Sequence, residues 1–396
     1  MDDHKLFLRT TRRAALACMA GAALLVAGCG GGGDAGAGTE QAASYVEGPV
    51  DGFGSIIVGG VRFDDSAAVV SGDDDEVRSA ADIKLGMVVA IDGDGIDRVG
   101  ARARARRIRF GAEIVGPVDS VDTAANTMVV LGQNVDVKDT TVFDEDIAGG
   151  LAGIAAGDVL AVNAQFDAAT GRYVATRIDE RPAADVFRLR GLVADLDTTA
   201  KTLRVGASLI SYASVDPATL PLLLANGLRV RVRLQTTPVA GVWTALTVRP
   251  GFRTVQDMAQ AEVHGWVTRF ASPAHFAVNG LEVDASSASF PDGTAGLELG
   301  ARVEVEGAIV NGVLVARKVE LEDRRDDLER FELHGAIVSI DHGVKVFVLR
   351  GLRVSFDGPL QLECRATLAI GQLVEVRGFL SADRTRLVAV RIRCES

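Results

Sequence analysis

Histidine is the side chain best suited to acid–base chemistry near neutral pH, and this chain of 396 residues contains five. Beyond residue 28 they are His264, His275, His334 and His342. His264 and His334 each directly precede a glycine that opens a short apolar segment. Because equivalent positions in two domains cannot easily converge on one substrate or metal, we interpret both as strand histidines that face solvent. A two-histidine site between neighbouring domains is the alternative.

The sequence motifs of common enzymes are absent. No lysine directly follows a glycine, which excludes a P-loop, and Gly-x-Ser-x-Gly, His-Glu-x-x-His and Cys-x-x-Cys do not occur. The sequence therefore predicts no catalytic residue and no cofactor.

Two acidic stretches could hold a calcium ion: residues 73–76, and the stretch that contains Asp92, Asp94 and Asp97. An EF-hand loop that begins at Asp92 needs glutamate at its twelfth position, where Ala103 stands. The second stretch also lies between two expected strands. We therefore interpret it as a charged hairpin turn, and keep Asp92, Asp94 and Asp97 as candidates for weak calcium binding.

Residues 102–109 form an arginine-rich strand. Successive side chains of a strand point to opposite faces, so Arg102, Arg104 and Arg106 share one face while Arg107 falls on the other. Such a basic face could bind the phosphate or carboxylate groups of an envelope polymer or of an acidic partner. The alternative is a solvated face that neutralises the neighbouring aspartates.

Trp266 follows an opening glycine, at a position expected to face outward. An outward-facing tryptophan is a natural interface residue, because it has both an apolar body and a polar N–H group. One tryptophan does not make a sugar-binding array, and aromatic residues are only 5% of the chain. This scarcity argues against the base stacking that binds single-stranded nucleic acid.

These residues are positioned by a pattern that recurs five times, at a period of roughly 70 residues, which is the signature of tandem repeats. Each copy has a glycine that opens an apolar strand, a second glycine before an alternating strand, and an alanine three residues before Ile or Val. The first glycines are Gly48, Gly116, Gly191, Gly265 and Gly335, the second are Gly86, Gly157, Gly227, Gly300 and Gly371, and the alanines are Ala105, Ala175, Ala245, Ala316 and Ala389.

Each copy reads as three strands, a connector and a further hairpin, which is the arrangement of a five-stranded OB-like barrel. Closing the barrel would remove exposed strand edges. A small open sandwich is the alternative. We thus predict an all-β chain of five tandem small OB-like five-stranded β-barrel repeats, at residues 46–110, 111–180, 187–250, 261–322 and 331–396.

The first 28 residues have the features of a targeting segment. A basic start is followed by an apolar run at 14–27 that is too short to span a bilayer comfortably. The run leads into Cys29 through small residues, which is similar to the bacterial lipobox, whose cysteine is lipidated. An ordinary secretory peptide is the alternative. The glycine-rich residues 29–45 are expected to form a flexible tether.

Gly30, rather than aspartate, follows Cys29, and the resemblance to enterobacterial lipoproteins then implies an outer-membrane anchor facing the periplasm. Without residues 1–28 the chain holds 38 basic residues (Lys and Arg) and 51 acidic residues (Asp and Glu), a formal charge of −13. So acidic a protein is a poor general binder of nucleic acid. The expected partners are therefore the membrane, through the lipid, and an envelope protein or polymer.

The repeated motifs also resemble a known bacterial family. The chain carries Leu299-Gly300-x-x-Val303-x-Val305-x-Gly307 and Val315-Ala316-x-x-Val319 after a Gly-x-Val opening. Together with the lipobox and tether, these look like the domain of unknown function 5666. The resemblance implies a cell-envelope lipoprotein of tandem small β domains, and it brings no assigned activity and no catalytic residues.

Two cysteines, Cys364 and Cys394, lie in the last repeat. An oxidising periplasm would allow them to form a disulfide. Two free thiols are the alternative, because sequence alone does not bring their Cα atoms within bonding distance.

These observations favour a non-enzymatic envelope lipoprotein that acts as a scaffold or binding module. A metal-dependent or hydrolytic envelope enzyme that uses a cleft between repeats is the alternative.

The lipid anchor can be tested with the substitution Cys29→Ala. We expect this variant to lose incorporation of labelled palmitate and to leave the membrane fraction, because the thiol that carries the lipid is gone. A Cys29→Ala protein that is still labelled and still fractionates with the outer membrane would refute the lipobox assignment.

Overall fold

The computed structural model describes residues 43–97, 99–167, 170–251, 257–321 and 331–395. Within these ranges the chain consists of β-strands, with three short 3₁₀ helices at Ala80–Asp82, Gly150–Gly153 and Pro217–Thr219. The predicted all-β class is confirmed. The expected targeting segment, Cys29 and most of the tether lie outside the described residues. Nowhere in the described ranges does a helix have the length and apolar character needed to cross a membrane.

The strands fall into five segments along the chain. The first segment contains β1 (Ala43–Phe53), β2 (Ile56–Val58), β3 (Val61–Asp64), β4 (Val69–Gly72), β5 (Val88–Asp94) and β6 (Arg102–Phe110). The second contains β7 (Ile114–Asp122), β8 (Thr127–Val130), β9 (Gln133–Phe143), β10 (Val159–Asp167) and β11 (Arg172–Glu180). The third contains β12 (Phe187–Asp197), β13 (Thr202–Val205), β14 (Ser208–Ser211), β15 (Arg229–Leu234) and β16 (Trp243–Pro250).

The last two segments follow in the same manner. The fourth contains β17 (Met258–Ser272), β18 (His275–Val278), β19 (Leu281–Asp284), β20 (Arg302–Val310) and β21 (Val313–Leu321). The fifth contains β22 (Phe331–Ala336), β23 (Ser339–Asp341), β24 (Val346–Leu349), β25 (Leu352–Ser355), β26 (Gln361–Glu363), β27 (Leu373–Leu380) and β28 (Arg386–Cys394).

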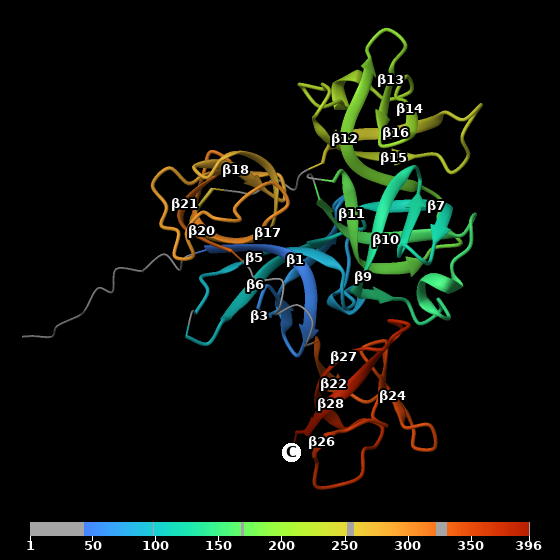
Figure 1. Ribbon diagram of the computed structural model, residues 1–396, viewed down its shortest axis with the longest axis vertical. Helices are drawn as coiled ribbons and strands as arrows, with labels where there is room; N and C mark the ends of the chain where they lie inside the picture. The colour runs from blue at the N-terminus through green and yellow to red at the C-terminus, as the bar shows by residue number, and fades with distance from the viewer. Residues whose placement is uncertain (1–42, 98, 168–169, 252–256, 322–330, 396) are drawn as a thin grey trace, which may run out of the picture. The chain divides into compact units, whose positions relative to one another are not determined.

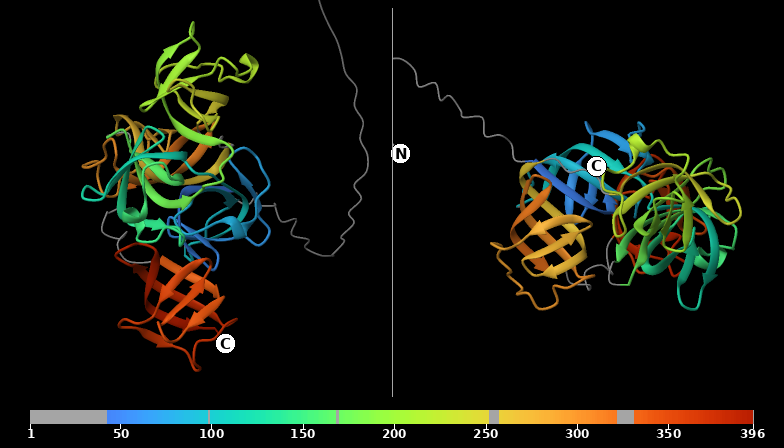
Figure 2. Two further views of the ribbon diagram at one scale, coloured as in Figure 1. Left: turned by 90° about the vertical axis from the view of Figure 1, so that its right-hand side faces the viewer. Right: turned by 90° about the horizontal axis from the view of Figure 1, so that it is seen from above.

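The fourth segment closes into a barrel in the strand order β17-β18-β19-β21-β20, drawn in orange in Figures 1 and 2. In it β17 pairs antiparallel with both β18 and β20, and β19 runs parallel to β21. In the first three segments, whose first strands are β1, β7 and β12, the equivalent strands pair in the same way. Pairing also continues between segments, because β7 pairs with β12 and β1 with β22, which joins strands into a 10-stranded and a 13-stranded sheet.

The recurrent glycines of the sequence pattern have a shared structural role. The second glycine of each copy has a positive φ, from +80° to +96°, a backbone conformation that residues with a Cβ atom rarely adopt. Its N–H donates to the carbonyl of the β-branched residue two positions after the first glycine, over 2.8–2.9 Å. The donor–acceptor pairs are Gly86 with Val50, Gly157 with Val118, Gly227 with Val193, Gly300 with Val267 and Gly371 with Ile337.

The recurrent alanines lie opposite a β-bulge between the last two long strands. Ala316 pairs with Gly307, where the register shifts. A Cβ atom on Gly307 would lie 2.2 Å from the Val315 carbonyl oxygen and 2.9 Å from the Cα atom of Ala316. The two strands approach so closely that only small residues fit, and all five recurrent alanines are buried.

The role of the second glycine predicts a local destabilisation in the fifth segment. Gly371 has φ +82° and open space around its Cα, so Gly371→Ala adds strain without a clash, at a cost of about 1–2 kcal/mol. Gly358 has equally open space and no such φ, so Gly358→Ala is the matched control and should change stability little. Hydrogen exchange of peptides from residues 331–394 measures the difference. Equal protection in the two variants would contradict this role.

Candidate functional site

The first strand and the last two strands of each segment run side by side and turn alternate side chains outward. Where these strands pair, six positions of the segment point outward. We call these six positions the outer grid of the segment. In the fourth segment the outer grid consists of Glu262 and His264 on β17, Glu304 and Glu306 on β20, and Lys318 and Glu320 on β21. The inward neighbours Val263, Val303, Val305 and Val319 are buried in the barrel core.

The register of the fourth segment places like charges directly opposite one another. Glu262 faces Glu306, and Glu304 faces Glu320, with His264 opposite Glu304. Cross-strand neighbours have Cβ atoms about 4.5–5.5 Å apart, and like charges at that distance are destabilising. Lys318 offsets part of the repulsion, with its Nζ 3.1 Å from Glu306 and 2.7 Å from Glu320.

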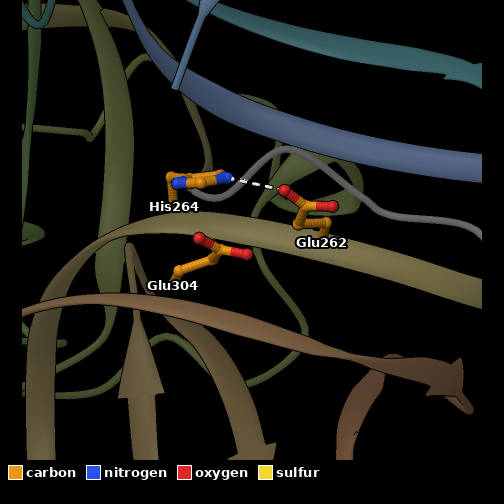
Figure 3. Close-up of side chains that lie close together, drawn as sticks. All are labelled: Glu262, His264 and Glu304. Carbon is orange, nitrogen blue, oxygen red and sulfur yellow. Dashed lines mark hydrogen bonds and ion pairs between the residues drawn. The ribbon is translucent and has the colours of Figure 1, made fainter. Parts of the chain in front are cut away.

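One corner of this grid brings three metal-ligand types together. The Nε2 atom of His264 lies 3.0 Å from a carboxylate oxygen of Glu262, and Glu304 lies beside both, as Figure 3 shows. One ligand atom from each of the three side chains lies within 4.8 Å of the others. Glu304, Glu306 and Glu320 form a second group that meets the same criterion and shares Glu304 with the first.

These groups are unusually buried for charged side chains on a strand surface. His264 is only 6% exposed and Glu306 7%. Part of the cover on His264 comes from Gly59, because a Cβ atom at Gly59 would lie 2.8 Å from the imidazole. The expectation that His264 faces solvent is therefore wrong, since a turn of the first segment packs on it.

Burial raises the pKa of the Glu304 carboxyl above its ordinary value. The neighbouring carboxylates Glu262 and Glu320 raise it further, while His264 and Lys318 act in the opposite direction. An electrostatic cost is thus concentrated at Glu304, and a bound cation would reduce it.

In the third segment the outer grid is almost entirely arginine: Arg188, Arg190, Arg231, Arg233 and Arg249, with Thr247 at the sixth position. It holds the acidic turn of the first segment, residues 73–76. Arg190 lies 2.5 Å from Asp73, Arg231 lies 3.4 Å from Asp74, and Arg188 lies 3.3 Å from Glu76. The stretch that could have held calcium instead pairs with arginine.

Glu113 of the second segment extends this ionic contact. It pairs with Arg190, and its other carboxylate oxygen accepts a hydrogen bond of 2.6 Å from Arg229. The side chains of Glu113, Arg190 and Arg229 are each at least nine-tenths buried. Buried charges are tolerated when they are paired in this way.

The outer grid of the fifth segment has a histidine and two glutamates at the positions where the fourth segment has them. Its other three positions are arginine. Its outer grid is Glu332, His334, Glu375, Arg377, Arg391 and Arg393. Glu375 contacts Arg377 and Arg393, at 3.2 and 3.5 Å. His334 lies 2.8 Å from Glu395. The acids of this grid are thus balanced by arginines of the same grid.

The arginine-rich strand β6 follows the predicted alternation only in part. Arg102, Arg104 and Arg106 are exposed, but so is Arg107, which was expected on the opposite face. A bulge opposite Asp92 and Gly93 shifts the alternation and places Ile108 in the core. At this bulge β6 has one more residue than β5. The prediction that Arg107 lies on the opposite face is therefore wrong.

Two of the three calcium candidates, Asp92 and Asp94, form ion pairs with arginines of β6. Asp92 lies 3.4 Å from Arg109 and 3.8 Å from Arg107, and Asp94 lies 3.3 Å from Arg106. Asp97 accepts a hydrogen bond from the backbone of Val99 in the turn. The three carboxylates are not among the groups of described residues whose ligand atoms converge.

Trp266 and the cysteine pair also have defined environments. Trp266 is half-buried, and its indole N–H donates to the Gln165 side chain of the second segment over 2.6 Å. It therefore lies in a contact between segments.

Cys364 and Cys394 form a disulfide, with Cα atoms 4.9 Å apart.

A pocket of about 260 Å³ is lined by residues of the first four segments. Its ionisable groups bind one another: the Tyr45 hydroxyl donates to Glu47 over 2.6 Å, and Glu113 pairs with Arg190 and Arg229.

Comparison with known proteins supports the family predicted from the sequence motifs. The model of a domain of unknown function, DUF5666, matches residues 115–179, 264–320 and 334–393. No curated protein matches the chain. Among solved structures, the chain described as "drosophila Unr CSD456" is 15% identical, with a TM-score of 0.14, over 53% of this chain and 97% of that one.

The outer grids were not predicted from the sequence. His264 and His334 were considered only as separate strand histidines. Aligning all six positions by their distance from the recurrent glycines would have shown the acidic, basic and mixed grids side by side.

The raised pKa of Glu304 predicts how stability depends on pH. A carboxyl whose pKa is higher in the folded state lowers stability as pH rises from its ordinary value near 4.5 through the raised value. In metal-free buffer, Glu304→Gln should therefore be more stable than the unmodified chain at pH 7, by about 0.5 kcal/mol after solvent screening. The difference should vanish below pH 4.

The exposed Glu298 of the same segment provides the control Glu298→Gln, and thermal melts at several pH values provide the measurement. A Glu304→Gln protein that is less stable at pH 7 would show that the carboxylate is favourably paired.

Proposed function

We propose that this chain is a non-enzymatic lipoprotein of the bacterial cell envelope, anchored in the outer membrane through Cys29. Five tandem OB-like barrels would form a scaffold that binds an envelope protein or polymer. The observation that carries the proposal is the insertion of the acidic turn 73–76 into the arginine grid of the third segment. This contact is an example of an outer grid holding an oppositely charged segment.

The contrast between core and surface supports the same conclusion. The glycines, β-branched residues and alanines of the repeat maintain one fold, whereas the outer grids change from basic to acidic to mixed. A scaffold that varies only its outward charges can offer several docking surfaces without altering its cores.

The exposed arginines of β6 are the proposed contact for an anionic envelope polymer. Arg102 and Arg104 lie on an outward face, and their guanidinium groups suit phosphate and carboxylate. This face is distinct from the occupied grid of the third segment.

The alternative is a metal-dependent or hydrolytic envelope enzyme that uses a cleft between segments. The pocket of about 260 Å³ is the feature that favours it. A broad hydrolase screen of the purified chain separates the two proposals. Turnover that is lost on Glu113→Gln would support the enzyme.

Sedimentation with purified peptidoglycan or lipopolysaccharide tests the scaffold proposal. The double variant Arg102→Ala and Arg104→Ala should reduce binding about 5-fold or more at low salt, since an exposed ion pair contributes up to about 1 kcal/mol. Arg365→Ala, at an exposed arginine of the fifth segment, is the control. Binding that is unchanged in the double variant and insensitive to salt would remove the arginine face from the proposal.

A further inference from the structure

The acidic grid of the fourth segment is a feature that the scaffold role does not use. Four glutamates, one lysine and one histidine share one strand face, which gives a formal charge of −3 with the imidazole neutral. Glu306, the most buried of these glutamates, pairs with Lys318, while Glu304 lies opposite both Glu320 and His264.

We propose that Glu262, His264 and Glu304 bind a divalent first-row transition-metal ion, with zinc as the representative ion. This proposal goes beyond the scaffold function and does not depend on it. The three side chains offer one imidazole nitrogen and two carboxylates, a set that zinc accepts.

The distances between the ligand atoms suit one ion. Two ligands bound at about 2.0–2.2 Å are about 3.3–4.4 Å apart, according to the angle between them. The three ligand atoms already lie within 4.8 Å of one another. Small side-chain rotations therefore complete the site, while the paired strands β17 and β20 hold the backbone fixed.

The surrounding residues supply the second layer of such a site. Glu306 and Glu320 lie across the strands from the ligands Glu262 and Glu304, and Lys318 contacts both of them. The negative charge of these neighbours favours a bound cation at the ligands. The imidazole favours zinc, iron or nickel over calcium and magnesium, which prefer all-oxygen sites.

The fifth segment provides a comparison within the same molecule. It has Glu332, His334 and Glu375 at the positions of the three proposed ligands, but Arg377 replaces Glu306 and Arg393 replaces Glu320. Those arginines lie beside Glu375 and take the place of a cation. The carboxylates of the fifth-segment group are thus balanced by arginines, since Arg62 of the first segment also lies 2.7 Å from Glu332, whereas the grid around the fourth-segment group is acidic.

Isothermal titration of the chelator-treated full chain with zinc alone tests the proposal. We expect one site at the grid whose affinity falls about 10-fold or more in His264→Gln and in Glu304→Gln. His334→Gln and Glu375→Gln are the matched controls and should leave that affinity unchanged. Cobalt in place of zinc should give an absorption band that His264→Gln alters.

A second variant keeps the test valid if the single substitutions unfold the chain. Glu306→Arg with Glu320→Arg copies the fifth-segment grid and should retain the fold while it weakens zinc binding. The proposal is overturned if zinc binds equally to all variants, or if calcium binds as tightly as zinc. It is also overturned if only an arginine-rich peptide binds the grid, since the face would then dock a basic segment.

Discussion

A backbone hydrogen bond between two distant points of each repeat is the constraint on which the rest of the structure depends. The N–H of the second glycine donates to the carbonyl of a buried valine or isoleucine on the first strand, and the residue after the glycine accepts from that strand in return. This exchange fixes where the second-to-last strand of the repeat begins relative to the first strand, and therefore the register between them. Because side chains alternate along a strand, a slip of one residue would move every outward group into the core.

Register in turn determines which charges meet. With Gly300 bound to Val267, Glu304 lies opposite His264, and Glu262 lies opposite Glu306. The same backbone geometry in the third segment places arginine opposite arginine. One set of main-chain contacts thus presents an acidic face in one segment and a basic face in another. The chemistry of each face is set by a few side chains that contribute little to the core.

Much of the fold could be predicted from the sequence, because its determinants are local. A glycine with positive φ, a β-branched core residue and a small residue at a bulge each recur in the sequence at a fixed spacing. The grids could not be predicted in the same way, since they depend on how three separate strands align. The bulge after Glu306 decides that Lys318 and Glu320 join the grid, and the bulge in β6 moves Arg107 to the surface. The burial of His264 depends on a turn some 200 residues away along the chain.

The opposite charges of the third and fourth grids also have a consequence for folding. If β15 and β20 were exchanged between these neighbours, Arg233 would face Glu262, and Arg188 would face Glu306. Like charges at these positions would then face opposite charges, so the cross-strand charges alone do not oppose the exchange. Domains generally fold as units during synthesis, the N-terminal one first, so the third segment can complete its sheet before β20 is made. The acidic turn of the first segment, made earlier still, occupies the arginines and protects the native pairing.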